Sequence, residues 1–222
     1  MKDEVFIVAG LRTPIAHRGG ALARVLPEEL GARVIRVLLQ RLGLRGEEVS
    51  GVLAGNAVGT GGNLARLMAL RAGLPEEVPS CTVDMQCASA AAAISLAAAK
   101  IASGQGDCFL AGGMESASLQ PLRVYDARDP RHALVPGGAY RTAQFSPGEL
   151  AEDAMLRGAE RVMQQEKVTR AELDAAVLRS HRLAAAAWRD GLLDDVVLPL
   201  PECARDTDIR PHLTQRLLDR LP

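Results

Sequence analysis

The chain has 222 residues, 48% of them hydrophobic and 24% charged, which is the balance of a globular protein and excludes disorder as the main state. A net charge of −1 provides no basic field for nucleic acid or an anionic membrane, and 3% aromatic residues argue against a base-stacking surface. The longest apolar run, residues 88–99, is alanine-rich and too short to span a bilayer. No secretory leader is recognised at the start, so we expect a cytoplasmic protein.

The cysteines lie far apart and form no C-x-x-C pair. This spacing predicts neither a disulfide framework nor a zinc site, and no metal ligand set is expected. The four cysteines are Cys81, Cys87, Cys108 and Cys203.

Short apolar runs alternate with helical patterns in the first half of the chain. The runs at 5–9, 52–54, 81–83 and 108–111 predict four buried strands. Helical spacing predicts helices over 27–42, 63–72 and 88–102. Strands that alternate with helices predict an α/β fold, with a mostly parallel sheet covered by helices on both faces. We assign residues 1–118 to this α/β domain.

Beyond residue 118 the pattern changes. Residues 119–148 are rich in Pro, Gly and Arg without clear periodicity, and they are longer than an ordinary connection. Helices are predicted over 149–165, from a capping box at Thr169 and Glu172 to about 188, and near 214–221. We therefore expect residues 119–222 to form an inserted loop excursion.

Cys87 lies where the strand at 81–83 runs into the helix that begins near Ala88. A thiol at this junction faces the unpaired amides and the positive dipole end of the helix, which favour the thiolate. The same amides are suited to hold a developing oxyanion. The helix carries Ala and Ser on nearly every face, so we expect packed elements all around it. Spacing alone favours the alternative, in which Cys87 is a small buried hydrophobe without chemistry.

Motifs along the whole chain resemble the amino-terminal part of the thiolase family, the acyl-CoA acyltransferases that make or cleave 3-ketoacyl-CoA. The motifs, in family order, are VAGLRTPI at 8–15, NLAR at 63–66, AGLP at 72–75 and AGGMESAS at 111–118. The resemblance implies a thiolase-like amino-terminal half with an inserted loop domain. The carboxy-terminal half of the family is not part of this sequence.

The resemblance implies that Cys87 is the nucleophile that accepts the acyl group of acyl-CoA as an enzyme thioester. In the family, a His in a G-H-P motif and a second Cys in a C-x-G-G-G motif handle the protons. Both motifs belong to the carboxy-terminal half, and this sequence ends before either. A coenzyme A thioester then enters as substrate, and no resident cofactor is implied. The acyl chain and the direction of the reaction stay open.

Three further residues match family positions for the substrate. Arg210 corresponds to an arginine that the family places against the CoA adenine, although a lone surface arginine is an equal interpretation. Ser146 and Pro147 lie in the segment that lines the pantetheine tunnel, where many thiolases have His and Met. The arginines at 123, 128, 131 and 141 are interpreted either as a phosphate-attracting cluster or as a solvated loop.

The first domain of the family has five strands, and the resemblance places the last of them beyond this sequence. The edge beside residues 108–111 would then be open and would invite pairing. We therefore expect a homo-oligomer, a second chain that carries the carboxy-terminal half, or both. Two alternatives to a thiolase-type acyltransferase remain. One is a non-catalytic thiolase-like subunit that stabilises a partner, and the other is a related condensing enzyme.

Overall fold

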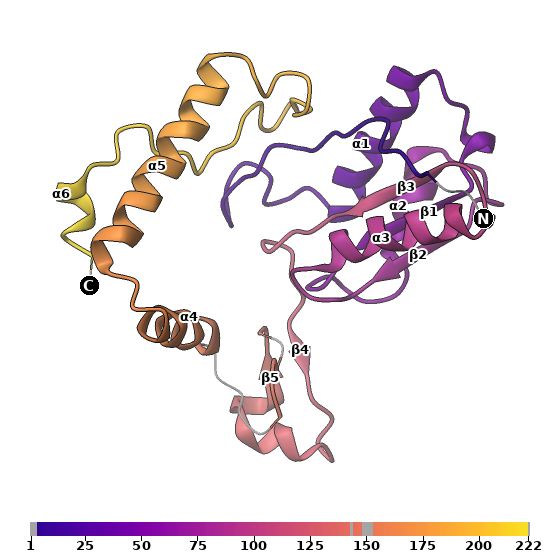
Figure 1. The fold of residues 1–222 in the computed structure, drawn as a ribbon. Helices are drawn as coiled ribbons and strands as arrows, with labels where there is room; N and C mark the ends of the chain where they lie inside the picture. Colours follow the sequence, from indigo (N-terminus) through magenta and orange to yellow (C-terminus); the bar gives the residue numbers. More distant parts are fainter. Residues whose placement is uncertain (1–3, 143, 148–152, 222) are drawn as a thin grey trace. The chain divides into compact units, whose positions relative to one another are not determined.

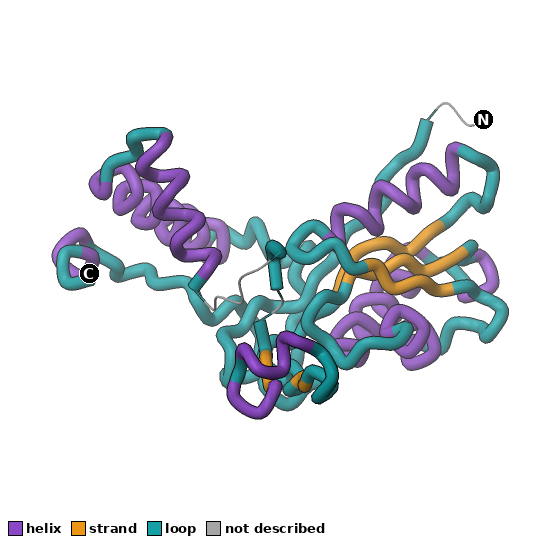
Figure 2. The backbone as a smooth tube through the Cα atoms, turned by 90° about the horizontal axis from the view of Figure 1, so that it is seen from below, coloured by secondary structure: helices purple, strands orange, loops and turns teal. Residues whose placement is uncertain are grey.

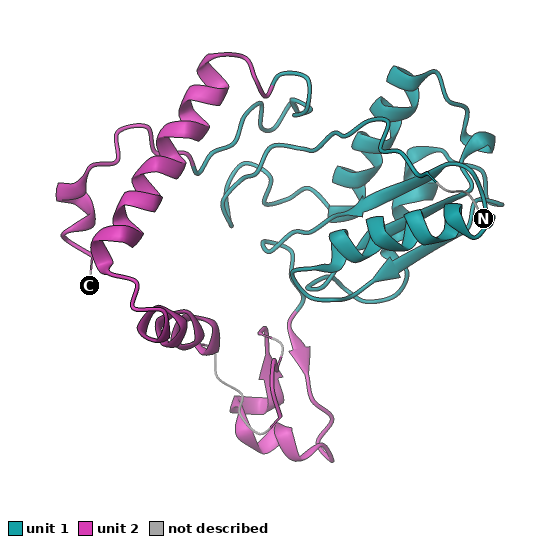
Figure 3. Ribbon diagram, viewed as in Figure 1, with its two compact units in different colours: residues 1–121, 194–208 teal, residues 122–193, 209–222 magenta. Residues whose placement is uncertain are grey.

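The computed structural model describes residues 4–142, 144–147 and 153–221. They form two compact units, one of residues 1–121 and 194–208, the other of residues 122–193 and 209–222 (Figure 3). The first unit extends to residue 121, three residues beyond the boundary at 118 expected from the sequence. It also includes residues 194–208, which the sequence analysis assigns to the excursion. Across the described residues, no helix combines the length and the apolar character needed to cross a bilayer.

The first unit is a small parallel sheet between helices (Figures 1 and 2). Its elements are α1 Pro27–Leu42, the 3₁₀ turn η1 Gly46–Glu48, β1 Gly51–Gly55, α2 Leu64–Ala72, β2 Ser80–Val83, α3 Ser89–Ala102 and β3 Phe109–Gly113. The strand order is β2-β1-β3, with Val52 opposite Ser80 on one side and opposite Leu110 on the other. The expected α/β class with a parallel sheet is confirmed.

The central strand β1 is buried on both faces, as expected for a parallel sheet. Its side chains alternate, so Val52 and Ala54 join a core with α1 and α2. Leu53 points to the opposite face and joins Ala93 and Ala97 of α3. The two cores enclose β1 from both faces, and the turn that carries Cys87 joins the neighbouring strand β2 to α3.

Local signals explain where these helices begin and end. Pro27 occupies the first turn of α1, and Gly43 ends the helix in a left-handed conformation with φ 63°. The side chain of Asn63 caps α2 by accepting a hydrogen bond of 3.2 Å from the N–H of Arg66. All three helices predicted in this half of the chain are confirmed within one residue.

The strand predicted at residues 5–9 is wrong. The segment has no strand partner among the described residues, so it is not part of the sheet. The expectation that α3 is packed on all sides is also wrong. Ile94 and Leu96, on either side of the face that packs on the sheet, are 43% and 45% exposed, because the sheet covers only the face that carries Ala93 and Ala97.

The tail at 194–208 packs back on the first unit. Asp206 binds the Arg12 guanidinium through two hydrogen bonds of 2.7 and 2.8 Å, and it accepts the N–H of Ile15 at 2.7 Å. Leu200 and Cys203 of the tail fill a second small core beside the start of α1. These contacts join the chain start to a segment nearly 200 residues away.

The second unit contains the helices and the loop of the excursion. Its elements are β4 Arg123–Val124, the 3₁₀ turns η2 Pro130–Leu134 and η3 Pro136–Gly138, β5 Ala139–Tyr140, α4 Ala154–Gln165, α5 Arg170–Arg189 and α6 Gln215–Leu218. The capping box predicted at Thr169 and Glu172 is confirmed, with the carboxylate accepting the Thr169 N–H at 2.8 Å. The first residues of the helix predicted over 149–165 lie outside the described residues.

Candidate active site

Cys87 lies in the turn that joins β2 to α3, two residues before the helix begins. Its side chain is exposed, and its thiol makes no hydrogen bond to any described residue. Among the described residues nothing buries Cys87, so the alternative of a small buried hydrophobe does not fit it. An unpaired, accessible thiol at a helix start is a geometry suited to nucleophilic attack.

The turn before Cys87 is strained. Gln86 has φ 53°, one of two positive values among the described non-glycine residues, and such residues cluster at functional sites. Asp84 supports the turn by accepting the Gln86 N–H at 2.9 Å. Cys87 follows this strained residue directly, and its side chain is exposed.

The Ser89 hydroxyl holds the same turn from the helix side. It donates to the carbonyl oxygen of Gln86 at 2.6 Å and accepts the N–H of Met85 at 2.8 Å, and its residue is only 5% exposed. A buried hydroxyl with both functions satisfied fixes the backbone on each side of the strained residue. Sequence reasoning treated this serine only as a small packing residue, and no sequence signal distinguishes it.

The first turn of α3 leaves amides available beside Cys87. The N–H groups of Ala90 and Ala91 form no hydrogen bond with any described residue, as is usual for the first turn of a helix. Groups of this kind stabilise negative charge that develops on a neighbouring atom. The oxyanion site expected from the sequence therefore has two candidate donors, the N–H groups of Ala90 and Ala91.

The start of α3 lies unusually close to the sheet. A Cβ atom added to Gly55 would come within 2.6 Å of the Ser89 Cβ and within 2.7 Å of the Ala90 backbone nitrogen. A Cβ atom on Gly113 would come within 3.2 Å of Ala90. These glycines allow the turn that carries Cys87 to rest on the strand ends, so the position of the thiol depends on them.

The remaining cysteines differ from Cys87 in exposure or setting. Cys81 is exposed on β2, Cys108 is half-buried and Cys203 is buried, with its thiol donating to the carbonyl oxygen of Arg205 at 3.1 Å. Burial raises the pKa of the Cys108 thiol, and the nearby Glu48 carboxylate raises it further. Among the described residues, no group of three or more His, Cys, Asp or Glu side chains is arranged to hold a metal ion.

This ordering predicts the pattern of alkylation by iodoacetamide at pH 7.5. Cys87 and Cys81 should react first, Cys108 more slowly because it is half-buried and its raised pKa lowers the thiolate fraction, and Cys203 only after unfolding. Raising the pH should speed the reaction of Cys108. Peptide mass spectrometry over time gives the order, and early labelling of Cys203 would contradict the described burial.

Arg210 lies in the second unit at the rim of a hollow of about 580 Å³. The hollow is lined by α5, α6 and the segments on either side of α6, mostly with apolar side chains: Val177, His181, Arg210, Pro211, His212, Leu213, Leu217, Leu218 and Leu221. The backbone N–H of Arg210 donates to Nδ1 of His181 at 3.2 Å, which leaves the exposed guanidinium free to move. A flat cation above an apolar hollow is suited to a planar ring.

Ser146 and Pro147 are exposed in a bend of the second unit, immediately before residues that are outside the described part. Cys87 belongs to the first unit, so the structure describes these substrate residues and the cysteine separately. Two of the four loop arginines are occupied locally. Arg128 pairs with Asp126 at 2.9 Å, and Arg131 pairs with Asp129 at 2.6 Å. For Arg128 and Arg131, the interpretation as a solvated loop therefore fits better than the interpretation as a phosphate-attracting cluster.

The chain matches a protein family by sequence over almost its entire length. Residues 5–216 match the family described as "Thiolase, N-terminal domain". A Staphylococcus haemolyticus (strain JCSC1435) protein named "Putative acetyl-CoA C-acetyltransferase VraB" is 35% identical over all of this chain and 58% of its own length. Its Staphylococcus aureus (strain COL) counterpart of the same name is 32% identical over 89% of this chain and 52% of its own length.

A solved structure gives the same assignment. The crystal structure of the Bacillus anthracis acetyl-CoA acetyltransferase superposes with a TM-score of 0.81 and 30% sequence identity, over 96% of this chain and 57% of that one. The relatives of this α/β chain, which has a cysteine at a strand-to-helix turn, are thus named as acyltransferases. The chain belongs to the thiolase family, through the amino-terminal domain of that family. It spans a little more than half the length of the relatives that it matches.

Proposed function

We propose that this chain carries the acyl-accepting part of a thiolase-type acyltransferase. The observation that carries the proposal is the exposed Cys87 thiol, which lies in a turn that contains the strained Gln86 and is fixed by the buried Ser89 hydroxyl. The names of the similar proteins support acetyl-CoA as the donor, because each is called an acetyl-CoA acetyltransferase. The proposed reaction is transfer of an acyl group between CoA thioesters by thiolytic cleavage or Claisen condensation.

In the first proposed step, the Cys87 sulfur attacks the thioester carbonyl of acyl-CoA. A new S–C bond forms, the bond between carbonyl carbon and CoA sulfur breaks, and CoA leaves as its thiol after taking up the proton from Cys87. The free N–H groups of Ala90 and Ala91 are candidates to stabilise the carbonyl oxygen while it carries negative charge. The second step passes the acyl group from Cys87 to the acceptor, so one difficult transfer becomes two easier ones.

The proton carrier is proposed to come from the carboxy-terminal part that the relatives have and this sequence does not include. In support, the described residues place no hydrogen-bonding histidine on the Cys87 thiol. We propose that this part is supplied by a second chain or by further sequence, and that the assembled protein is a homo-oligomer. A cytoplasmic location is proposed with it, because four free thiols suit a reducing compartment. A role in lipid metabolism is proposed from the names of the relatives, which are acetyl-CoA acetyltransferases.

We propose that Arg210 and its hollow receive the adenine end of CoA, and that Ser146 and Pro147 lie along the pantetheine arm. Arg210→Ala should raise the KM for acetyl-CoA about fivefold with kcat nearly unchanged, because a stacking cation contributes about 1 kcal/mol at an exposed site. The substitution keeps the backbone hydrogen bond to His181. Steady-state kinetics of the assembled enzyme measure the effect.

Arg216→Ala is the matched control for this prediction. Arg216 is exposed on α6 and does not line the hollow, so its loss should leave the KM unchanged. Equal KM values for Arg210→Ala and the parent enzyme would remove Arg210 from the substrate site.

A second candidate is a non-catalytic thiolase-like subunit that stabilises a partner enzyme. It is favoured by the absence of a base on Cys87 within the described residues. The related condensing enzymes are disfavoured, because the family match is to thiolase over residues 5–216. Assay of acetoacetyl-CoA cleavage by this chain together with a carboxy-terminal part decides between the candidates. Turnover that requires both parts supports the acyltransferase, and turnover by the carboxy-terminal part alone supports the stabilising subunit.

A further inference from the structure

One buried polar side chain links the ends of two strands. Asn56 follows β1 directly and is 8% exposed. Its amide NH2 group donates to the carbonyl oxygen of Met114 at 2.8 Å and to Oε1 of Glu115 at 2.9 Å, and its Oδ1 accepts the Gly59 N–H at 3.1 Å. A flipped amide would set its oxygen against two other oxygens, so these partners allow one orientation of the side chain.

The Glu115 carboxylate, which follows β3, completes this group. Its Oε2 accepts the N–H groups of Ala57 and Val58 at 2.9 and 3.1 Å, while its Oε1 accepts the Asn56 amide. Hydrogen bonds to an ionised acceptor are stronger than those between neutral groups. We call Asn56 and Glu115 together the strand-end clasp, because they fix the chain directly after β1 against the chain directly after β3.

The backbone at the clasp contacts both ends of the turn that carries Cys87. The Asn56 N–H donates to the carbonyl oxygen of Val83 at 3.1 Å, and the turn leaves β2 at this residue. Gly55, directly before Asn56, lies so close to Ser89 that an added Cβ would not fit. A shift of this short piece of backbone would therefore move the start and the end of the turn.

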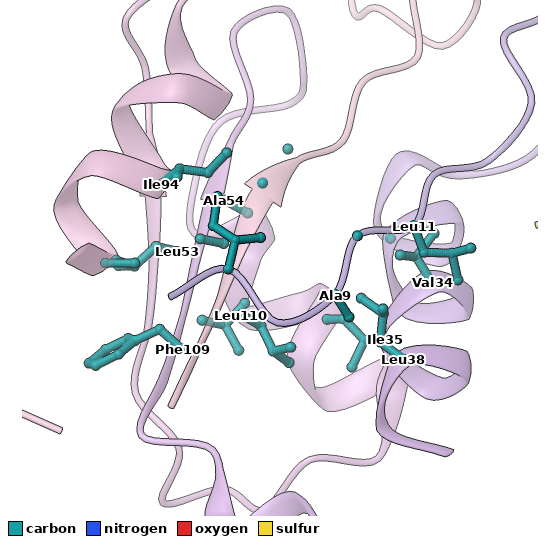
Figure 4. Close-up of a pocket in the computed structure, with 18 of the residues that line it drawn as sticks. Ala9, Leu11, Val34, Ile35, Leu38, Leu53, Ala54, Ile94, Phe109 and Leu110 are labelled. Carbon is teal, nitrogen blue, oxygen red and sulfur yellow. The ribbon is translucent and has the colours of Figure 1, made fainter. Parts of the chain in front are cut away.

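Apolar packing beside the clasp does not replace it. Glu115 is the only acidic residue among the described residues that line a cavity of about 470 Å³. The labelled side chains on this cavity are apolar, among them Ile35 of α1, Ile94 of α3 and Leu110 of β3 (Figure 4). Apolar contacts are not directional, whereas hydrogen bonds are, so the orientation of the strand ends depends on the clasp.

We infer that the strand-end clasp positions the Cys87 turn for acyl transfer, with Asn56 and Glu115 as positioning residues. The inference rests on the proposed acyltransferase function and deepens it. Neither side chain bonds Cys87 in the described part of the chain, so both act through the backbone on which the turn rests. Loosening the clasp should lower kcat with little change in KM, because it disturbs the geometry of the reacting sulfur and not the proposed CoA contacts.

The test uses Glu115→Gln in this chain, assembled with the carboxy-terminal part of the Staphylococcus haemolyticus relative. Glu115 is an exposed residue, so the variant should fold, but the one oxygen of the new amide cannot serve both Asn56 and the loop N–H groups. In acetoacetyl-CoA cleavage, kcat should fall about tenfold or more, with KM within about twofold of the parent.

Leu74→Ala is the control for lost stability alone. Leu74 is 4% exposed in the core with α1 and α2, and its N–H bonds Ala69 rather than the strand ends. This variant should be destabilised at least as much as Glu115→Gln, yet keep kcat within about twofold at a temperature where it stays folded.

Hydrogen exchange of the chain by itself supplies a readout without turnover. The N–H groups of Met85, Gln86, Ala88 and Ser89 are all bonded within the turn. In Glu115→Gln their exchange should speed up about tenfold while that of α1 stays unchanged, whereas Leu74→Ala should speed both alike.

A paired substitution tests whether the two side chains act together. Asn56→Asp sets a second carboxylate against Glu115, so kcat should fall further than in Glu115→Gln. Adding Glu115→Gln gives the new carboxylate a donor and should raise kcat about fivefold or more above Asn56→Asp alone.

The inference is overturned if Glu115→Gln loses no more kcat than Leu74→Ala, if exchange in the turn is unchanged, or if the paired substitution recovers nothing. Exchange does not depend on catalysis. An inactive parent complex, with faster exchange of the turn in Glu115→Gln, would therefore count against the proposed function while the clasp itself stood.

Discussion

Cys87→Ala should abolish acyl transfer in the assembled enzyme, lowering kcat by about 10⁴-fold or more, because the acyl acceptor is removed outright. Stability should change little, since the side chain is exposed and its thiol makes no hydrogen bond to a described residue. Acetoacetyl-CoA cleavage measures the activity, and the circular dichroism spectrum and the melting temperature check the fold.

Cys81→Ala is the matched control, because Cys81 is also an exposed, free cysteine and lies only six residues away. It should keep activity within about twofold of the parent. If Cys87→Ala keeps full activity in an assembled complex, the acyl group never passes through this cysteine. The stabilising-subunit alternative would then describe the chain.

Gly55→Ala should destabilise the first unit by about 3 kcal/mol and also impair the site. The new Cβ would lie 2.6 Å from the Ser89 Cβ and 2.7 Å from the Ala90 backbone nitrogen. A backbone atom cannot turn aside as a flexible side chain can, so the start of α3 must shift and carry Cys87 with it. Urea unfolding of the chain by itself, with the rate of Cys87 alkylation, measures both effects.

Gly112→Ala is the control for steric crowding in this comparison. An added Cβ at Gly112 meets no atom within 4 Å, so the free energy of unfolding of the isolated chain should change by less than about 1 kcal/mol. Equal stability of the two variants would show that α3 does not rest on Gly55 as described.

The helices could be predicted because their signals are local. Pro27 at the start of α1, the Asn63 cap of α2 and the Thr169 box of α5 each satisfy backbone groups within a few residues. The return of 194–208 could not be predicted in the same way. The bond between Arg12 and Asp206 joins residues 194 positions apart, and neither residue type indicates its partner.

The prediction at residues 5–9 failed for a different reason, because a local sequence pattern cannot show whether a partner strand is present. Its composition predicts a strand, but a strand forms only beside a hydrogen-bonding neighbour, and none is present in the described residues, so the prediction is wrong. The exposed face of α3 has the same origin, because an apolar helix is covered only when a second layer exists.

For the candidate site, the position of Cys87 at a strand-to-helix junction was predictable from the order of apolar run, cysteine and Ala-rich helix. Its orientation was not. The positive φ of Gln86 and the two hydrogen bonds of the Ser89 hydroxyl depend on three-dimensional placement, and a serine among alanines gives no hint of them. The role of Arg210 rests on family resemblance and on its place at the hollow.

The most direct measurement is intact-mass and peptide mass spectrometry of the assembled protein, quenched in acid within seconds of mixing with acetyl-CoA. Thioesters survive acid, so an added mass of one acetyl group should appear on the peptide that holds Cys87 and vanish when free CoA is added. No acetyl group on that peptide, or one on another residue that persists with added CoA, would contradict the proposed role of this thiol.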